Sequence, residues 1–448
     1  MKVTDQLDIG DKPLNSFHNL HLAPPVRIVD DLVAVPIDIQ KIDSHVVFDM
    51  ATKSAHVKTT MSFISGTKDG NPIFDLRQDI LQAYLNDEPF PVEKLQHHNF
   101  EGGSDAELRI LEKMIPRITE NTLTLIYDLN QPQCPRSQPI GWDPPSLYFE
   151  FWFSDLWAAR YLEMWFPSNL IYDQFKVNLN IEIINTGIKH MVFSNGQINT
   201  LDQNHWQIEF PDRFCSFSPM LCIVASDMIE YRQGVMTLPD NGNQVHLDTF
   251  KLSSTSDDLA IVENNLKGYI ANNITKIGPY IHGDKFTTFI WSNTGGRSME
   301  YDGAVTTEMA VLEHEVFHSW FARGLKPASQ NDAWVDEGWT VYNTSNACQV
   351  KPFDMADKPI VLSSPQPFNR VTPNSDPSPN AYLDGSRFFA GLAAAIGYDN
   401  LRSYMSSFYH SNMYNLVTTG QLETYLRYKS GIKEISNYFH RFVYGFDT

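Results

Sequence analysis

Apolar and polar residues alternate along much of the first half of the chain. In residues 55–63 (AHVKTTMSF) and 175–183 (FKVNLNIEI), almost every second side chain is apolar. This period of two is typical of strands that bury one face and expose the other. We therefore expect residues 41–228 to form a β domain, a sandwich or saddle of antiparallel strands.

Two segments of this half depart from the alternation. Residues 1–40 show no regular period and contain the break Pro24-Pro25, so we expect an irregular N-terminal segment. Residues 105–114 are instead expected to form a helix that crosses the β domain.

The pattern changes after about residue 228, and residues 229–448 are expected to form a second, mainly helical domain. Residues 307–325 are apolar on nearly all sides, which predicts one long buried helix. Gly324 is placed to end that helix, and Asn331 or Asp332 to start the next one.

The predicted buried helix carries the motif His314-Glu315-Val316-Phe317-His318. In a helix the two histidines lie one turn apart on one face, about 6 Å along the axis, so both imidazoles can bind one Zn²⁺. Glu315 lies beside that position, where it can accept a proton from a metal-bound water. Glu337 follows His318 after eighteen residues and would supply a carboxylate ligand from the next helix. Three ligands leave one coordination position open, which predicts a catalytic zinc site.

The apolar surroundings of this motif favour a metal site over a solvated helical face. His-Glu-x-x-His alone arises by chance in roughly one chain of this length per hundred. Here, however, the histidines and glutamates would be buried, and a buried charge without a partner is costly. One zinc ion would provide that partner for His314, His318 and Glu337 together.

The spacing His-Glu-x-x-His-x18-Glu, with Trp334-x-x-Glu337-Gly338, resembles that of the gluzincin aminopeptidases, the aminopeptidase N and leukotriene-hydrolase family. Residues 318–320 (HSW) and 337–342 (EGWTVY) are most similar to the leukotriene-hydrolase branch. The likeness extends loosely from about residue 45 to residue 445. It implies a thermolysin-like catalytic domain with a small mixed sheet after the β domain. It also implies that the family's C-terminal helical domain is missing.

The resemblance assigns further residues to the site. Gly295, Gly296, Met299 and Glu300 match the family's Gly-x-Met-Glu-Asn element in part, although Arg297 and Tyr301 depart from it. It implies that Glu300 holds the free α-amino group of a substrate, with the two glycines near the substrate backbone. Tyr382, in Tyr382-Leu383-Asp384-Gly385, matches the family's Tyr-x-x-Gly and would stabilise the oxyanion of the intermediate.

Composition narrows the class of protein and its partners. A formal net charge of −19 disfavours binding to nucleic acid. No run of eighteen apolar residues predicts a membrane span, and the N-terminus has no apolar signal core, so a cytoplasmic location is expected. The four cysteines, Cys134, Cys215, Cys222 and Cys348, have no paired spacing and are expected to be buried free thiols.

These observations predict a zinc metallopeptidase, an aminopeptidase that acts on peptides with a free N-terminus. Two alternatives remain open. One is an endopeptidase or peptide-tailoring protease with an open cleft, where a second copy or a partner chain could replace the missing domain. The other is a catalytically idle scaffold or binding protein in which zinc only holds two helices together.

Overall fold

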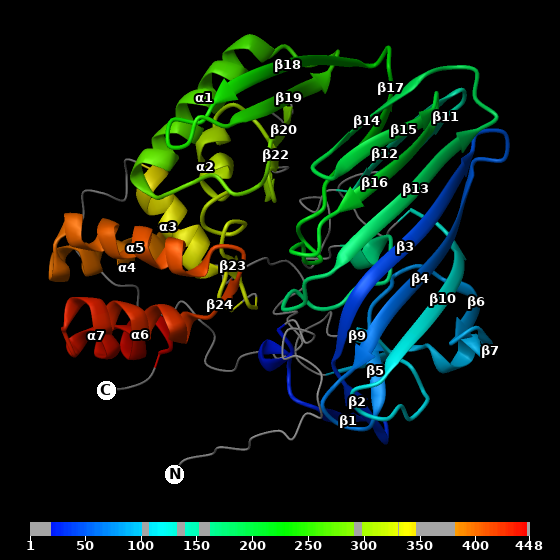
Figure 1. The fold of residues 1–448 in the computed structure, drawn as a ribbon, viewed down its shortest axis with the longest axis horizontal. Helices are drawn as coiled ribbons and strands as arrows, with labels where there is room; N and C mark the ends of the chain where they lie inside the picture. Colours follow the sequence, from blue (N-terminus) through cyan, green and yellow to red (C-terminus); the bar gives the residue numbers. More distant parts are fainter. Residues whose placement is uncertain are drawn as a thin grey trace.

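The computed structural model shows two lobes (Figure 1). It describes residues 19–100, 107–131, 139–151, 162–290, 298–329, 331–345 and 381–445. The long strands lie on one side of the molecule and the helices on the other. We refer to the described residues up to Ala225 as the N-terminal lobe and to those from Ile229 onward as the C-terminal lobe.

An eight-stranded sheet forms the body of the N-terminal lobe, in the order β15-β16-β13-β3-β4-β10-β6-β7. Along β13 every second residue is buried, which confirms the strands predicted from alternation. β3 pairs antiparallel with β4 but parallel with β13, so the sheet is not wholly antiparallel as we had expected. The strands are β3 (Ile37–Asp49), β4 (Ser54–Ser65), β6 (Ile80–Leu85), β7 (Glu88–Phe90), β10 (Glu120–Asp128), β13 (Lys176–Ile184), β15 (Gln197–Asp202) and β16 (His205–Phe210).

Two smaller sheets complete this lobe. The first has the order β1-β2-β5-β9-β8 and the second the order β11-β12-β17-β14. Their strands are β1 (Arg27–Val29), β2 (Leu32–Val35), β5 (Asn71–Phe74), β8 (His97–Asn99), β9 (Glu107–Ile110), β11 (Ile140–Asp143), β12 (Ser146–Phe151), β14 (His190–Ser194) and β17 (Leu221–Ala225).

Two predictions about the first half of the chain were wrong. Within residues 105–114, where a helix was expected, the described part contains strand β9, which pairs with β5 and β8. The apolar run there is too short for its period to separate a helix from a strand. Strand structure also begins at Arg27, well before residue 41, because β1 and β2 add to the smaller sheet.

The C-terminal lobe combines a five-stranded mixed sheet, in the order β18-β19-β20-β22-β21, with seven α-helices among the described residues. A mainly helical domain is therefore not confirmed. The sheet contains β18 (Ile229–Thr237), β19 (Gln244–Leu252), β20 (Lys285–Ile290), β21 (Met299–Tyr301) and β22 (Ala304–Thr307). The helices are α1 (Leu259–Lys276), α2 (Leu312–Phe317), α3 (Trp334–Thr344), α4 (Leu383–Ile396), α5 (Tyr398–Asn412), α6 (Thr419–Ser430) and α7 (Glu434–Tyr438).

The helix predicted over residues 307–325 is much shorter in the structure. α2 contains six residues, and the chain then turns back through Ala322, whose φ is 120°. The apolar side chains after α2 are buried without helical geometry, so their all-round burial did not indicate a helix. Gly324 therefore ends no helix. Asp332 does not cap α3 either, because its carboxylate accepts hydrogen bonds from Thr419.

The core of the N-terminal lobe continues into the C-terminal lobe. Phe193 of β14 stacks on Phe250 of β19, with ring centroids 3.8 Å apart, and Phe250 contacts Phe289 of β20. Tyr301 and Ala304 belong to the same buried cluster. The helices surround a second cluster that includes Val316, Trp320 and Trp339, among others. Among the residues that the structure describes, no helix is both long and apolar enough to cross a membrane.

Candidate metal centre

His314 and His318 lie one turn apart, as the motif predicted, although the helix that carries them ends at Phe317. Their Nε2 atoms are 3.1 Å apart. Nδ1 of His318 lies 3.1 Å from the carbonyl oxygen of Phe321, which can only accept a hydrogen bond. When His318 is neutral, Nδ1 is therefore the donor and Nε2 presents a lone pair toward His314.

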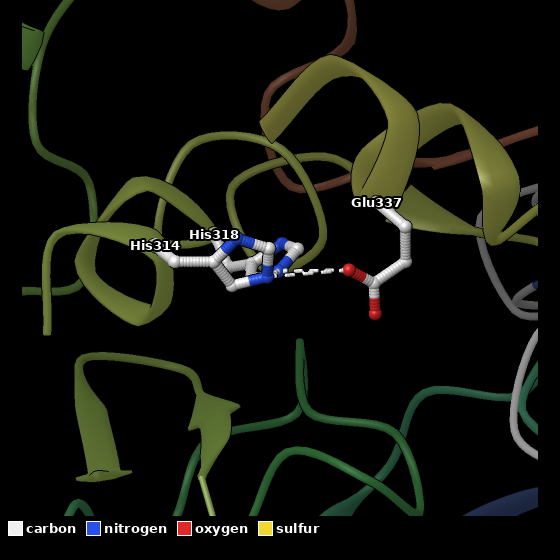
Figure 2. A group of neighbouring side chains, drawn as sticks. All are labelled: His314, His318 and Glu337. Atoms are coloured by element: carbon white, nitrogen blue, oxygen red, sulfur yellow. Dashed lines mark hydrogen bonds and ion pairs between the residues drawn. The ribbon is translucent and has the colours of Figure 1, made fainter. Parts of the chain in front are cut away.

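Glu337 reaches the two imidazoles from α3 (Figure 2). Its Oε2 atom lies 3.4 Å from Nε2 of His314 and 3.3 Å from Nε2 of His318. This oxygen is buried, and both imidazole Nε2 atoms lie within ion-pair distance of it. A buried carboxylate in this position needs positive charge beside it, supplied either by a protonated imidazole or by a metal ion.

The spacing of these three atoms fits zinc. Ligand atoms that each lie about 2.1 Å from a tetrahedral zinc are roughly 3.4 Å apart. The three observed separations run from 3.1 to 3.4 Å. Nitrogen and carboxylate donors of this kind are also those that zinc prefers. His314, His318 and Glu337 therefore form a set of donors with the geometry of a three-ligand zinc site.

Electrostatics at this centre favour positive charge. Burial alone would raise the pKa of Glu337, but His318 and His314 lower it well below its ordinary value. Burial likewise opposes the charged form of His318, yet Glu300 and Glu337 raise its pKa far above the usual range. Burial raises the pKa of Glu315, and the negative charge of Glu300 raises it further. Several carboxylates thus face the same small volume.

Glu300 lies on β21, and its carboxylate approaches Glu315 and His318, with one donor atom of each within 4.8 Å of the others. Its Oε1 atom accepts a hydrogen bond from Nη2 of Arg323 at 2.8 Å. The sequence had not indicated Arg323, because no local spacing links it to residue 300. Met299 is half-buried beside Glu300. Gly295 and Gly296 lie outside the described residues.

Tyr382 lies at the start of α4, next to the metal centre. Its hydroxyl donates a hydrogen bond to Oε1 of Glu337 at 2.8 Å, and its ring stacks on His314 with centroids 6.5 Å apart. The residue as a whole is 40% exposed, so it borders open space. Two glycines allow this approach: a Cβ on Gly338 would lie 2.8 Å from the backbone of Gly385, so α3 and α4 touch directly.

The structure thus brings together six of the residues predicted for the site: His314, His318, Glu337, Glu315, Glu300 and Tyr382. The loop expected over residues 363–380 lies outside the described residues. Two of the four cysteines, Cys134 and Cys348, lie outside them as well, whereas Cys215 and Cys222 are buried and free as expected.

Comparison with known proteins finds relatives by fold alone. No family model and no curated protein sequence matches the chain. An M1 zinc metallopeptidase from Deinococcus radiodurans is similar over 91% of this chain and 94% of its own, with a TM-score of 0.64 and 15% sequence identity. An aminopeptidase A from Legionella pneumophila, solved with aspartic acid, is similar over 92% of this chain and 50% of its own, with a TM-score of 0.66 and 12% identity. The chain therefore has the fold of these zinc metallopeptidases.

Proposed function

We propose that the chain is a zinc-dependent metallopeptidase that removes N-terminal residues from peptides. The observation that carries this proposal is the triangle formed by Nε2 of His314, Nε2 of His318 and Oε2 of Glu337, with sides of 3.1 to 3.4 Å. The shared fold with zinc metallopeptidases supports it. When bound, zinc supplies Lewis-acid polarisation of a carbonyl and a lowered pKa for water.

Glu315 would act as the general base in this reaction. It follows His314 directly in the chain and is buried beside His318, so its carboxylate lies next to the candidate metal position. We propose that a carboxylate oxygen of Glu315 takes the proton of the attacking water and later passes it to the leaving amine. Because Glu315 is only 5% exposed, little bulk solvent reaches its carboxylate.

Tyr382 would stabilise the negative charge that develops on the scissile carbonyl oxygen. Its hydroxyl donates to Glu337 Oε1, next to the candidate ligand atom. A rotation about its side-chain bonds would redirect that hydrogen bond toward a substrate oxygen.

Glu300 would bind the substrate's α-ammonium group, since a fixed carboxylate beside the cleft selects a free N-terminus. Proteins of this fold have been solved with bound L-tryptophan or L-arginine, both of which carry a free α-amino group, and this supports a ligand with a free amine. Glu300 also forms an ion pair with Arg323, so a substrate amine would share that carboxylate with the guanidinium.

Hydrolysis of amino-acid anilides, measured with and without a chelator, tests the proposal. We expect release of the chromophore from free aminoacyl anilides, loss of release with the chelator and recovery with added zinc. N-acetylated anilides should react far more slowly. Activity that the chelator does not change would refute zinc catalysis, and equal rates with free and acetylated substrates would favour the endopeptidase alternative.

A further inference from the structure

Arg323 connects the N-terminal lobe to Glu300. Its side chain is only 4% exposed, and its guanidinium carbon lies 3.9 Å from the ring centroid of Phe217. From the edge of the same group, Nη2 donates to Oε1 of Glu300 at 2.8 Å and Nε donates to the backbone oxygen of Glu300 at 3.1 Å. The guanidinium therefore lies between an aromatic ring of one lobe and a strand of the other.

Two bonds from one planar group restrict Glu300 more than a single ion pair would. The Nε and Nη2 atoms of arginine have a fixed relative position, so one bond locates the backbone of Glu300 and the other its carboxylate. A lysine would supply the same charge through a single flexible ammonium. The carboxylate still has capacity for further hydrogen bonds, because an ionised carboxylate accepts about four.

The N-terminal lobe contacts the same strand a second time. Nδ2 of Asn195 donates to the backbone oxygen of Asp302, two residues after Glu300, at 2.8 Å. This bond lies at the turn between β21 and β22, which requires the positive φ of Gly303. Asn195 and Phe217 therefore both fix the position of β21 from the N-terminal lobe.

We propose that Arg323 is a positioning residue for recognition of the substrate's amino group, and that Phe217 holds it in place. This inference rests on the proposed function. Arg323 orients Glu300, and Glu300 then binds the ammonium of the substrate. Selectivity for a free N-terminus therefore depends on a contact between the lobes, although Phe217 and Arg323 do not touch the substrate.

The test compares ligands with and without the amine. The affinity of the zinc-loaded protein for leucine amide and for N-acetyl-leucine amide is measured by calorimetry, and KM and kcat are measured separately with leucine anilide. We expect Arg323→Lys and Arg323→Gln to weaken binding of leucine amide about tenfold, which is the loss typical of one hydrogen bond to a charged group. The affinity for N-acetyl-leucine amide should not change. KM should rise more than kcat falls. Phe217→Leu should weaken binding of the free amine in the same direction, by a smaller factor.

Lys251→Met is the matched control. The side chain of Lys251 is 8% exposed and its ammonium binds Glu230 and the backbone oxygen of Thr255, so none of its ion pairs or hydrogen bonds involves Arg323 or Glu300. We expect this variant to lose thermal stability but to keep the ratio of its affinities for leucine amide and N-acetyl-leucine amide. If Arg323→Lys and Arg323→Gln fold and have the same ratio of affinities as the native protein, the inference is wrong. It is also wrong if Arg323→Lys binds leucine amide as tightly as the native protein does. If both variants fail to fold, an unchanged ratio in Phe217→Leu overturns it. A native protein that neither binds nor cleaves these ligands would refute the proposed function itself.

Discussion

Tyr382 and Glu337 are joined by a hydrogen bond of 2.8 Å from the phenol to Oε1, while Oε2 of the same carboxylate faces the two histidines. The phenol therefore orients the carboxylate that we assign to zinc. In metal sites, partners of this kind contribute to metal affinity as well as to activity.

Removal of the Tyr382 hydroxyl is expected to affect both properties. Tyr382→Phe should weaken zinc binding about tenfold, because Glu337 loses its orienting donor. Turnover at saturating zinc should fall by roughly two to three orders of magnitude, the loss typical of one oxyanion donor. Zinc affinity is measured by competition with a chromogenic chelator, and kcat with anilides. Tyr398→Phe, a change in an exposed tyrosine at the start of α5, is the control and should alter neither quantity.

Replacement of the proposed general base should separate metal binding from catalysis. Glu315→Gln preserves the shape of the side chain but cannot accept the proton, so kcat should fall by about two to four orders of magnitude. Zinc content, measured by elemental analysis, should remain one per chain. Glu313→Gln alters a neighbouring residue of the same helix and should keep its activity. Near-normal turnover in Glu315→Gln would exclude this carboxylate as the base.

Removal of zinc should lower thermal stability. A ligand that binds only the folded chain stabilises it by about 2.7 kcal/mol at a concentration one hundred times its dissociation constant. The unfolding midpoint, followed by fluorescence, should therefore fall on addition of a chelator and recover with zinc. His314→Gln should lose this response. His246→Gln, in an exposed position of β19, should retain it.

Asp302 gives a pH dependence of stability that is independent of the metal. Burial alone would raise its pKa, but Lys326 and His282 lower it well below the ordinary value. A carboxylate with a lowered pKa contributes stability above its unfolded pKa of about 3.9, and the contribution is lost as the pH falls through the folded value. Asp302→Asn should thus cost about 3 to 5 kcal/mol at pH 7, since Lys326 stays buried without its partner.

Urea unfolding at pH 7 and near pH 3 measures this effect. The difference between Asp302→Asn and the native protein should narrow at the lower pH. Asp240→Asn, in an exposed turn, should show no such pH-dependent difference. A constant difference across this range would contradict the assigned charge state.

Some features could be predicted because a local pattern specifies them. Alternation along residues 176–184 follows from one buried and one exposed face, which β13 has. The spacing of His314 and His318 needs only a single helical turn, so the motif remained informative although α2 is short. Glu337 was found from its spacing of eighteen residues after His318, and α3, which begins at Trp334, carries it.

Other features depend on contacts between distant segments. β9 became a strand because β5 and β8 lie on either side of it, and nothing within residues 107–110 indicates those neighbours. Arg323 pairs with Glu300 across 23 positions of the chain and packs on Phe217, more than a hundred positions away. A single sequence contains no period or motif for such a pair.

The stacking of Phe193 on Phe250 determines what happens when the polypeptide is cut between the two lobes. A cut in the exposed turn around Asp227 would leave each fragment with an uncovered aromatic surface that only the other fragment matches. Such surfaces favour reassociation or aggregation over independent folding. The two halves are therefore expected to gain and lose their structure together, and a clipped preparation to migrate as one particle.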